Sequence, residues 1–592
     1  MRRTEGKAGL LARAAETKSG RMLLSACLML LLVGLTAALF PITFLTNDDA
    51  SIMYTFAGYF TGEPYPVHGF VNLPLGYITS LLYMLLPTVP WWPVLQLLCV
   101  AISIWVIFYT LWDVGAEHGL PAWGMLTLNT LLYLLVLIYS VFRLSFTLTA
   151  CMLGTAGILR LLSADTGGEH RQPLPLFVML ESTALMIACF LFRNSTGYSM
   201  VCFWAAAVAY HALNTLVGWK QQERKHELIR IAGFAACCLV VFGALVWLNG
   251  WSYENMNPAG YAAFEDARGR YVDFPHVTYE QDPAFFASLG WDKEIYDLVD
   301  RSCFIDPHVT ADSLNAVLAY DTGAQVSLTQ RVATALHYGE AFFRGNGPAE
   351  YMLVAPVLIA LWALFRFLRD RRRWVEALIL FGIALGSFLL CLYLCFAERL
   401  ILRAFQVIAI PAAAMLLLLC LRIRPAGDRP HESKPKIALR VSLLLLTLFA
   451  LSWGITKNML WIGQFQPQQQ MLNMRTAERY AMDHPKNVYV CMPTFIFNSE
   501  AFKTYPQEKP TNLLDWGDTG IYSGWKTRQL ELNGVQPFTP EVFQQENVYL
   551  MGTFEGKELQ VLIDYLVKDA GAKGLERVEA FGDGYAVFQV VY

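Results

Sequence analysis

Long apolar runs separated by short polar segments dominate the hydrophobic pattern of the chain. The first run, 22–45, follows a basic head and is longer than the apolar part of a secretory signal peptide. Each further run is long enough to cross a bilayer as a helix. These runs lie at about 91–112, 120–141, 144–162, 174–193, 196–218, 231–250, 348–368, 375–397, 400–422 and 440–461. The pattern predicts a multi-pass α-helical membrane protein whose first span is retained.

One more apolar run, 70–87, is ambiguous. Counting it as a span gives 12 helices and places three basic loops outside the cell, against the rule that Lys and Arg of short loops stay inside. If the run instead lies on the outer surface as an interfacial helix pair, about 11 helices remain and all three basic loops are cytoplasmic. We adopt this second topology, with a cytoplasmic N-terminus and an extracytoplasmic C-terminal domain in a plasma membrane, typical of a bacterial protein.

Charge supports this topology. Hydrophobic residues make up 55% of the 592 residues and charged ones only 16%, and the net charge of −3 argues against a nucleic-acid binder. Short cytoplasmic segments hold 23 Lys and Arg against 11 Asp and Glu. The loop 251–347 holds 6 against 14, and the tail 462–592 holds 11 against 16. Both large polar parts are therefore expected outside.

This topology divides the chain into five parts. They are a basic N-terminus (1–21), a transmembrane core (22–250) with a first outer loop (46–90), a large outer loop (251–347), C-terminal transmembrane helices (348–461) and an outer α/β domain (462–592). In the last part, residues 467–484 and 556–569 read as helices. The segments 487–491, 547–551 and 585–592 read as strands.

Five basic residues do not fit the charge rule, because this topology places each at or near the outer end of a helix. They are Arg143, Arg193, Arg399, Arg403 and Lys457. Such residues snorkel to headgroups or mark a site for an anionic partner. A guanidinium can hold two phosphate oxygens at once, so the cluster fits the phosphate of a lipid carrier.

An acidic pair, Asp48 and Asp49, opens the first outer loop directly after the first span. Adjacent carboxylates repel, so one readily gains a raised pKa and acts as a base, or the two share a divalent cation. A helix-capping Asp is the simpler interpretation of the pair alone. The following stretch favours a binding site, because its aromatic, imidazole and amide groups suit a sugar. These candidate substrate-binding residues are Tyr54, Tyr59, His68 and Asn72.

A first helix, an acidic pair opening the first outer loop and a Pro-Leu-x-Tyr type segment (74–77) together resemble the GT-C membrane glycosyltransferases. That superfamily includes protein O-mannosyltransferases, aminoarabinose transferases and oligosaccharyltransferases, and the resemblance is strongest over 22–200. It implies a GT-C-like fold and a polyprenyl-phosphate-linked sugar donor. It also implies that Asp48 or Asp49 deprotonates or orients the acceptor, while Arg193, Arg399 and Arg403 bind the carrier phosphate.

Two functions from different classes remain open. The first is an inverting hexosyl- or pentosyltransferase of the cell envelope, and the second is a glycolipid or polysaccharide transporter that uses the same charges as a pathway. A transporter would be expected to show internal repeats and charges near the midplane. The charges here collect at one face and no convincing repeat is present, so the enzyme is favoured.

The large outer loop carries weak candidates for a metal site. Some combination of Asp273, His276, Asp306 and His308 could supply carboxylate and imidazole ligands, although tight ligand spacing is absent. An acceptor-binding surface explains these residues equally well. Cys303 and Cys491 lie in the outer parts, where a disulfide is permitted but cannot be inferred from sequence.

Overall fold

The computed structural model describes residues 10–166, 172–218, 220–320, 327–345, 347–369, 373–423, 469–491, 500–502, 509–517, 520–553, 557–581 and 585–592. The chain divides into two compact units, and each is described by itself. Unit 1 comprises Met1–Ile42, Leu95–Val246 and Arg331–Gln466. Unit 2 comprises Thr43–Val94, Trp247–Gln330 and Pro467–Tyr592.

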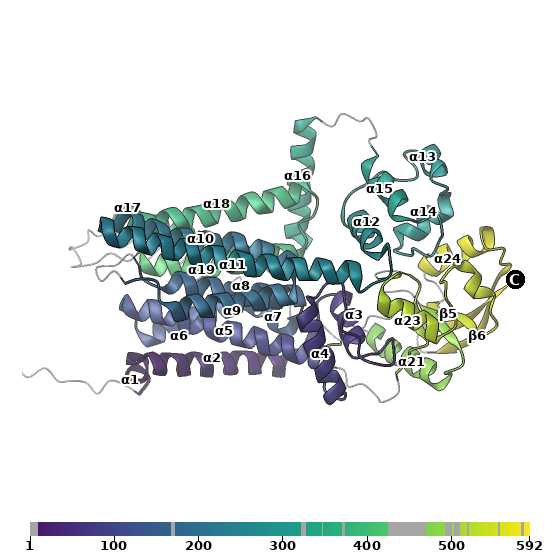
Figure 1. Cartoon of the computed structure of the whole chain (residues 1–592), viewed down its shortest axis with the longest axis horizontal. Helices are drawn as coiled ribbons and strands as arrows, with labels where there is room; N and C mark the ends of the chain where they lie inside the picture. Colours follow the sequence, from purple (N-terminus) through teal and green to yellow (C-terminus); the bar gives the residue numbers. More distant parts are fainter. Residues whose placement is uncertain are drawn as a thin grey trace, which may run out of the picture. The chain divides into compact units, whose positions relative to one another are not determined.

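Unit 1 is a bundle of helices (Figure 1). Its elements are α1 (Leu10–Glu16), α2 (Lys18–Leu39), α5 (Trp91–Glu117), α6 (Ala122–Leu132), the π-helical turn η1 (Tyr133–Leu137), α7 (Tyr139–Phe142), the short strand β2 (Arg143–Leu144), α8 (Phe146–Ser163), α9 (Leu176–Phe192), α10 (Asn194–Gly218), α11 (Gln221–Asn255), α16 (Leu328–Gly345), α17 (Gly347–Arg369), α18 (Trp374–Phe396) and α19 (Leu402–Arg422). Three of these, α5, α11 and α16, begin or end in unit 2.

The multi-pass helical fold predicted from the apolar runs is confirmed. Each predicted span that falls within the described residues overlaps helix, with α6, η1 and α7 together corresponding to 120–141, although α2 ends at Leu39, before the predicted end of the first span at 45. Seven of the described helices are long and apolar enough to cross a membrane. The predicted span 440–461 lies outside the described residues, so the total of 11 stays a prediction.

Two helices form the centre of unit 1. In both α8 and α19, 94% of the most apolar 18-residue window is buried, against 17% for α2 and α11 and 22% for α18. The large apolar side chains exposed on the outer helices are those expected to face lipid, because only apolar groups are tolerated there. Among the helices so compared, α8 and α19 are therefore the innermost.

The run 70–87 forms one helix, α4 (Leu73–Leu85), instead of the predicted helix pair. At 1.5 Å per residue its 13 residues extend about 20 Å, too little for a hydrocarbon core of about 30 Å. Its large apolar side chains Ile78, Leu81 and Met84 are about half exposed or more, whereas Thr79 and Ser80 are buried. A helix that turns apolar residues outward and polar residues inward is typical of an interfacial segment.

Unit 2 combines segments from three parts of the sequence. Its elements are β1 (Thr43–Phe44), α3 (Asn47–Phe56), α4, α12 (Tyr261–Asp273), α13 (Pro283–Ser288), α14 (Lys293–Asp300), α15 (Ala311–Ala319), α21 (Gln469–Asp483), β3 (Val488–Cys491), β4 (Leu513–Asp515), α23 (Gly524–Leu532), the 3-10 turn η3 (Pro540–Gln544), β5 (Val548–Thr553), α24 (Lys557–Lys568), β6 (Gly574–Phe581) and β7 (Tyr585–Val591).

A five-stranded sheet organises the C-terminal part of unit 2, in the order β4-β3-β5-β7-β6. Strand β3 pairs in parallel with β4 and β5, and β7 pairs antiparallel with β5 and β6. The predicted α/β character is confirmed, and three predicted strands and two predicted helices correspond to β3, β5, β7, α21 and α24. Strands β4 and β6 and helix α23 were not predicted.

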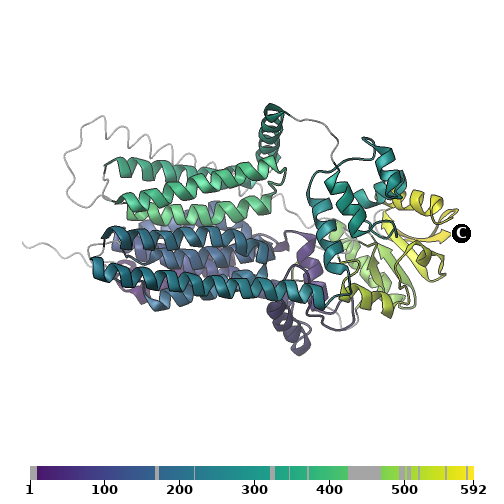
Figure 2. The same ribbon diagram turned by 45° about the horizontal axis from the view of Figure 1, so that its top comes forward.

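The large loop after α11 shares one hydrophobic core with this sheet. Trp291 and Phe304 of the loop belong to the same cluster of buried residues as Trp516, Leu550 and Tyr565 of the C-terminal part. Two views of the ribbon show α12, α14 and α15 beside the C-terminal sheet and helices (Figures 1 and 2). The loop is thus a structural layer of unit 2.

A buried ion pair joins α23 to the sheet. The Lys526 Nζ atom donates to Asp515 Oδ2 at 2.7 Å and to the main-chain oxygen of Asp515 at 3.2 Å. The two side chains are 0% and 1% exposed. Each charge has lost its hydration, so each depends on the other for compensation.

Removing one partner of this pair should destabilise unit 2 strongly. We expect Lys526→Met to lower the free energy of unfolding by about 3–5 kcal/mol, because Asp515 would stay buried without its counter-charge. The double variant Lys526→Met with Asp515→Leu should recover much of the loss. Denaturant titration of the purified protein, followed by tryptophan fluorescence, measures both. A double variant as unstable as the single one would contradict this account.

Candidate functional site

The acidic pair lies in the first turn of α3. The helix begins at Asn47 after an extended Thr46, whose Oγ1 atom donates to Asp49 Oδ2 at 3.3 Å. Asp49 is fully buried, and Asp48 is partly exposed. The N-terminus of a helix carries partial positive charge, so acidic side chains are favourably placed in this turn. Thr46 is the N-cap residue. The two aspartates lie inside the first turn and do not cap the helix, contrary to the simpler interpretation of the pair.

His68 is buried close to the acidic pair. Its Nδ1 accepts from the Phe70 main-chain N–H at 3.4 Å, which leaves the Nε2 proton for Ser51 Oγ at 3.4 Å. Burial lowers the pKa of His68 to about 4, while the charge of Asp48 acts in the opposite direction. The imidazole is thus neutral near pH 7.

The other predicted substrate-binding residues also face the protein interior. Tyr54 and Tyr59 stack with ring centroids 4.3 Å apart, and both rings are fully or nearly fully buried. Asn72, directly before α4, is 1% exposed. These side chains pack in the interior around α3 and α4. Their contact with a substrate stays a prediction.

In unit 1, Arg193 lies between α9 and α10 and contacts the start of α8. Its Nε donates to Ser195 Oγ at 2.8 Å, and one terminal nitrogen donates to Thr147 Oγ1. The guanidinium carbon lies 4.6 Å from the centre of the Phe146 ring. Arg143 ends α7, three residues before Phe146. Arg193 therefore contacts the start of α8, close in sequence to Arg143.

The N-terminal ends of α8 and α19 lie at the same end of unit 1. Near their starts, Cys151 Sγ lies 3.9 Å from the main-chain oxygen of Val407. Near their ends, Arg422 donates to the main-chain oxygen of Ser163. The two helices are therefore parallel. Arg403, in the first turn of α19, consequently shares an end of the bundle with Arg193.

Helix α10 runs in the same direction. Its residue His211 binds the main-chain oxygen of Leu161 at 2.8 Å through Nε2, and its Tyr210 accepts from Arg422 at 2.6 Å. Three helix N-termini thus meet at the end that holds Arg193, and each adds partial positive charge. Arg399 lies just before α19, in a turn where Glu398 adopts a left-handed φ of 52°.

Two arginines at the opposite end of unit 1 are paired with carboxylates. Arg160 donates to Glu181 at 2.6 Å, and Arg373 to Glu376 at 2.8 Å. The first ion pair joins α8 to α9, and the second lies within the start of α18, so both indicate a structural role. Of the predicted phosphate ligands, Arg143, Arg193, Arg399 and Arg403 belong to unit 1, and Lys457 lies outside the described residues. The acidic pair belongs to unit 2, so its approach to the arginines stays a prediction.

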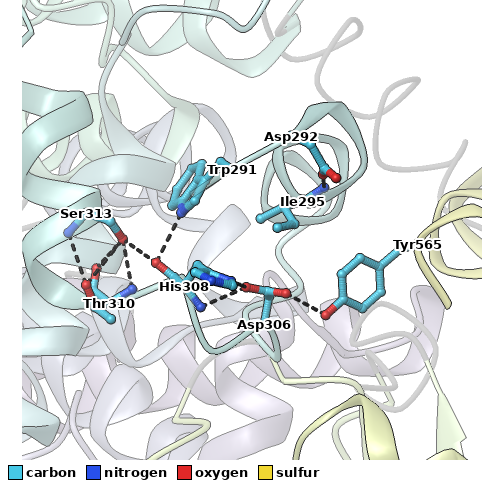
Figure 3. Close-up of polar contacts among 8 residues, drawn as sticks. All are labelled: Trp291, Asp292, Ile295, Asp306, His308, Thr310, Ser313 and Tyr565. Carbon is cyan, nitrogen blue, oxygen red and sulfur yellow. Dashed lines mark hydrogen bonds and ion pairs between the residues drawn. The ribbon is translucent and has the colours of Figure 1, made fainter. Parts of the chain in front are cut away.

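The weak metal candidates form two separate contacts. Buried Asp306 accepts from His308 Nδ1 at 3.0 Å and from the Tyr565 hydroxyl at 2.6 Å, as Figure 3 shows. His276 lies against the ring of Tyr271, with centroids 3.9 Å apart. Within the described ranges, no group of three or more His, Cys, Asp and Glu side chains could hold a metal ion. A divalent cation between Asp48 and Asp49 stays a prediction.

Cys303 and Cys491 are both buried in unit 2 and form no disulfide with each other. Burial raises the pKa of the Cys491 thiol well above its usual value, because a buried site disfavours the charged thiolate. The Cys303 thiol donates to the main-chain oxygen of Trp516 at 3.0 Å. The two residues therefore contribute to the core as thiols in this structure.

Sequence reasoning missed Thr147 and Ser195, the hydroxyl partners of Arg193. Both lie within the first turn of a helix, beside the predicted basic residues. The signal was present, because a hydroxyl residue before an apolar run marks a helix start, and Ser145 does cap α8 by accepting from the Thr147 N–H. A search for hydroxyl residues at the same helix ends as the stray arginines would have found them.

No model of a known protein family matches the chain, and no curated protein sequence matches it. Among solved structures, ArnT of Cupriavidus metallidurans bound to undecaprenyl phosphate is similar, with 11% identity and a TM-score of 0.37 over 96% of this chain and 98% of that one. AglB, an oligosaccharyltransferase of Archaeoglobus fulgidus in complex with an inhibitory peptide and a dolichol-phosphate, is similar with 12% identity and a TM-score of 0.41 over 96% and 74%.

The buried imidazole predicts an acid-sensitive stability. Because the pKa of His68 falls from 6.5 in the unfolded chain to about 4 in the folded one, the unfolded chain binds the proton first. The free energy of unfolding should therefore fall as pH drops from about 6.5 towards 4, by at most roughly 1.4 kcal/mol per unit. In His68→Gln this part of the slope should vanish. Melting temperatures across this pH range measure it, and identical slopes in both proteins would contradict the prediction.

Proposed function

We propose that the chain is an integral membrane glycosyltransferase that moves a hexosyl or pentosyl group from a polyprenyl-phosphate-linked donor to a cell-envelope acceptor at the outer face of the plasma membrane. The observation that carries this proposal is the setting of Arg193. Two hydroxyl groups and an aromatic ring orient its guanidinium at the end of unit 1 where α8, α10 and α19 begin. Helix N-termini and guanidinium groups together favour phosphate.

The donor phosphate is assigned to the basic residues of this end. Arg193 and Arg403 bind its oxygens, and Arg143, Arg399 and Lys457 add positive charge around it. A phosphate that leaves with the bonding electron pair gains negative charge in the transition state, and fixed cations stabilise that charge. The same residues would hold the carrier of a lipid-linked sugar before and after transfer.

The acceptor is assigned to the acidic pair. Asp48 or Asp49 takes the proton of the acceptor hydroxyl as its oxygen attacks the anomeric carbon. The acceptor oxygen attacks from the face opposite the phosphate, and the bond between the anomeric carbon and the phosphate oxygen breaks. The anomeric configuration therefore inverts. The partly exposed Asp48 is accessible to an acceptor, and the buried Asp49 is held by Thr46. The proposal therefore assigns the role of the base to one of these two aspartates.

Replacing the base should abolish most of the transfer. We expect Asp48→Asn or Asp49→Asn to lower the rate of sugar transfer about 100-fold or more, because an amide cannot accept the proton. The measurement uses membrane vesicles and a radiolabelled polyprenyl-phosphate sugar. Asp312→Asn is a matched control, because Asp312 also lies in the first turn of a helix of unit 2. Full activity in both pair variants would exclude the acidic pair as the base.

Arg193 should be sensitive to a change that keeps its charge. Arg193→Lys removes the planar fork, so we expect kcat/KM for the lipid-linked donor to fall roughly tenfold or more. Arg160→Lys is the matched control, because Arg160 also stacks on a ring, that of Tyr109 at 5.0 Å, but lies at the opposite end of unit 1. Equal losses in the two variants would indicate a packing role for Arg193 and contradict phosphate binding.

A further inference from the structure

The C-terminal part of unit 2 contacts the far end of the helix that carries the acidic pair. The Lys509 Nζ atom donates to the main-chain oxygen of Ala57 at 2.7 Å and to that of Gly62 at 3.2 Å. Ala57 is the C-cap residue of α3. The last carbonyls of a helix lack partners within the helix and carry partial negative charge, so an ammonium group there stabilises the helix end.

An aromatic contact joins the same two parts. Phe60 stacks on Trp525 of α23 with ring centroids 4.9 Å apart and an angle of 21° between the rings. Both side chains are almost fully buried. Phe60 also meets Tyr54, a residue of α3, edge to face at 5.6 Å. Trp525 therefore supports α3 through one intervening ring.

The segment between Phe60 and α3 has little freedom to yield. Gly58 adopts a φ of +70°, and a Cβ atom there would lie 2.1 Å from the main-chain carbon of Glu63. The Tyr65 main-chain N–H donates back to Thr55 of α3 at 3.1 Å. The segment 57–65 is thus folded tightly onto the helix end. A displacement of Phe60 is consequently passed to α3 instead of being absorbed by the loop.

Trp525 has a rigid base of its own. Its neighbour Lys526 forms the buried ion pair with Asp515 of β4, and Ser523 caps α23 by accepting from the Lys526 main-chain N–H at 3.3 Å. The sheet therefore fixes α23, and α23 fixes the ring on which Phe60 rests. Lys509 precedes β4 by four residues, so it is attached to the same sheet.

We propose that Lys509 and Trp525 are positioning residues for the acidic pair: by fixing the C-terminal end of α3 they set the place of Asp48 and Asp49 at its other end. The 10 residues of α3 extend about 15 Å, and a short helix transmits a displacement along its axis. A catalytic group misplaced by about 1 Å can cost about 100-fold in rate. This inference rests on the proposed glycosyl transfer for its kinetic consequence but not for its structural one.

The kinetic test compares lysine variants. Lys509→Met keeps the unbranched chain as far as Cε and removes the ammonium group, so we expect kcat to fall about tenfold while KM for the donor changes less than about twofold. Lys509→Arg should retain most of the activity, because it can still donate to both carbonyls. Lys573→Met is the matched control: Lys573 also donates to a main-chain oxygen, that of Tyr592 at 3.0 Å, but remote in sequence from α3.

A second measurement does not depend on activity. Amide hydrogen exchange of 47–65 should be faster in Lys509→Met than in the natural chain, and unchanged in Lys573→Met. If amide exchange of 47–65 in Lys509→Met were as slow as in the natural chain, the inference would be overturned. If the natural chain transfers sugar, an unchanged kcat in Lys509→Met would overturn it as well. If the natural chain transfers no sugar from any polyprenyl-phosphate donor, the proposed function fails, and the exchange result still decides whether Lys509 holds α3. Trp525→Phe, which keeps a ring, provides a milder second variant if Lys509→Met does not fold.

Discussion

The parallel packing of α8 and α19 is the contact on which the arrangement of charge in unit 1 depends. A bilayer interior cannot satisfy polar groups, so a chain that crosses it must gather those groups at the helix ends. Two buried parallel helices give the bundle two unlike ends. At one end helices α8, α10 and α19 begin beside Arg193, and at the other Arg160 and Arg373 are neutralised by carboxylates. Under the proposed function, these unlike ends would confine the lipid phosphate to one side of the membrane.

The helices could be predicted from the sequence because each apolar run is continuous and has nearly the length of a span. Their exact ends could not, since α11 extends from Gln221 to Asn255, beyond the apolar run 231–250, into polar sequence. Strand β4 has three residues, too few to show a period. The core shared by the loop 251–347 and the C-terminal sheet joins residues more than 200 positions apart, and periodicity carries no information on such contacts.

For the candidate site, the sequence identified charged residues in unusual places, and the structure shows which neutral residues hold them. Asp48 and Asp49 were recognised by their position after the first span, but the burial of Asp49 and the hydroxyl contact with Thr46 depend on how α3 packs. Charge alone could not reveal Thr147, Ser195 or Trp525. Their roles come from the residues that folding brings near them.

The outward apolar face of α4 has a consequence for how reactants meet. A helix of this kind settles between headgroups and hydrocarbon, and α4 packs in unit 2 beside α3, the helix of the acidic pair. Under the proposed function, the acidic pair is then kept at the depth where lipid phosphates lie. A donor confined to the bilayer arrives by lateral diffusion at that depth, so the encounter becomes a search in two dimensions and the amount of donor per membrane area governs the rate.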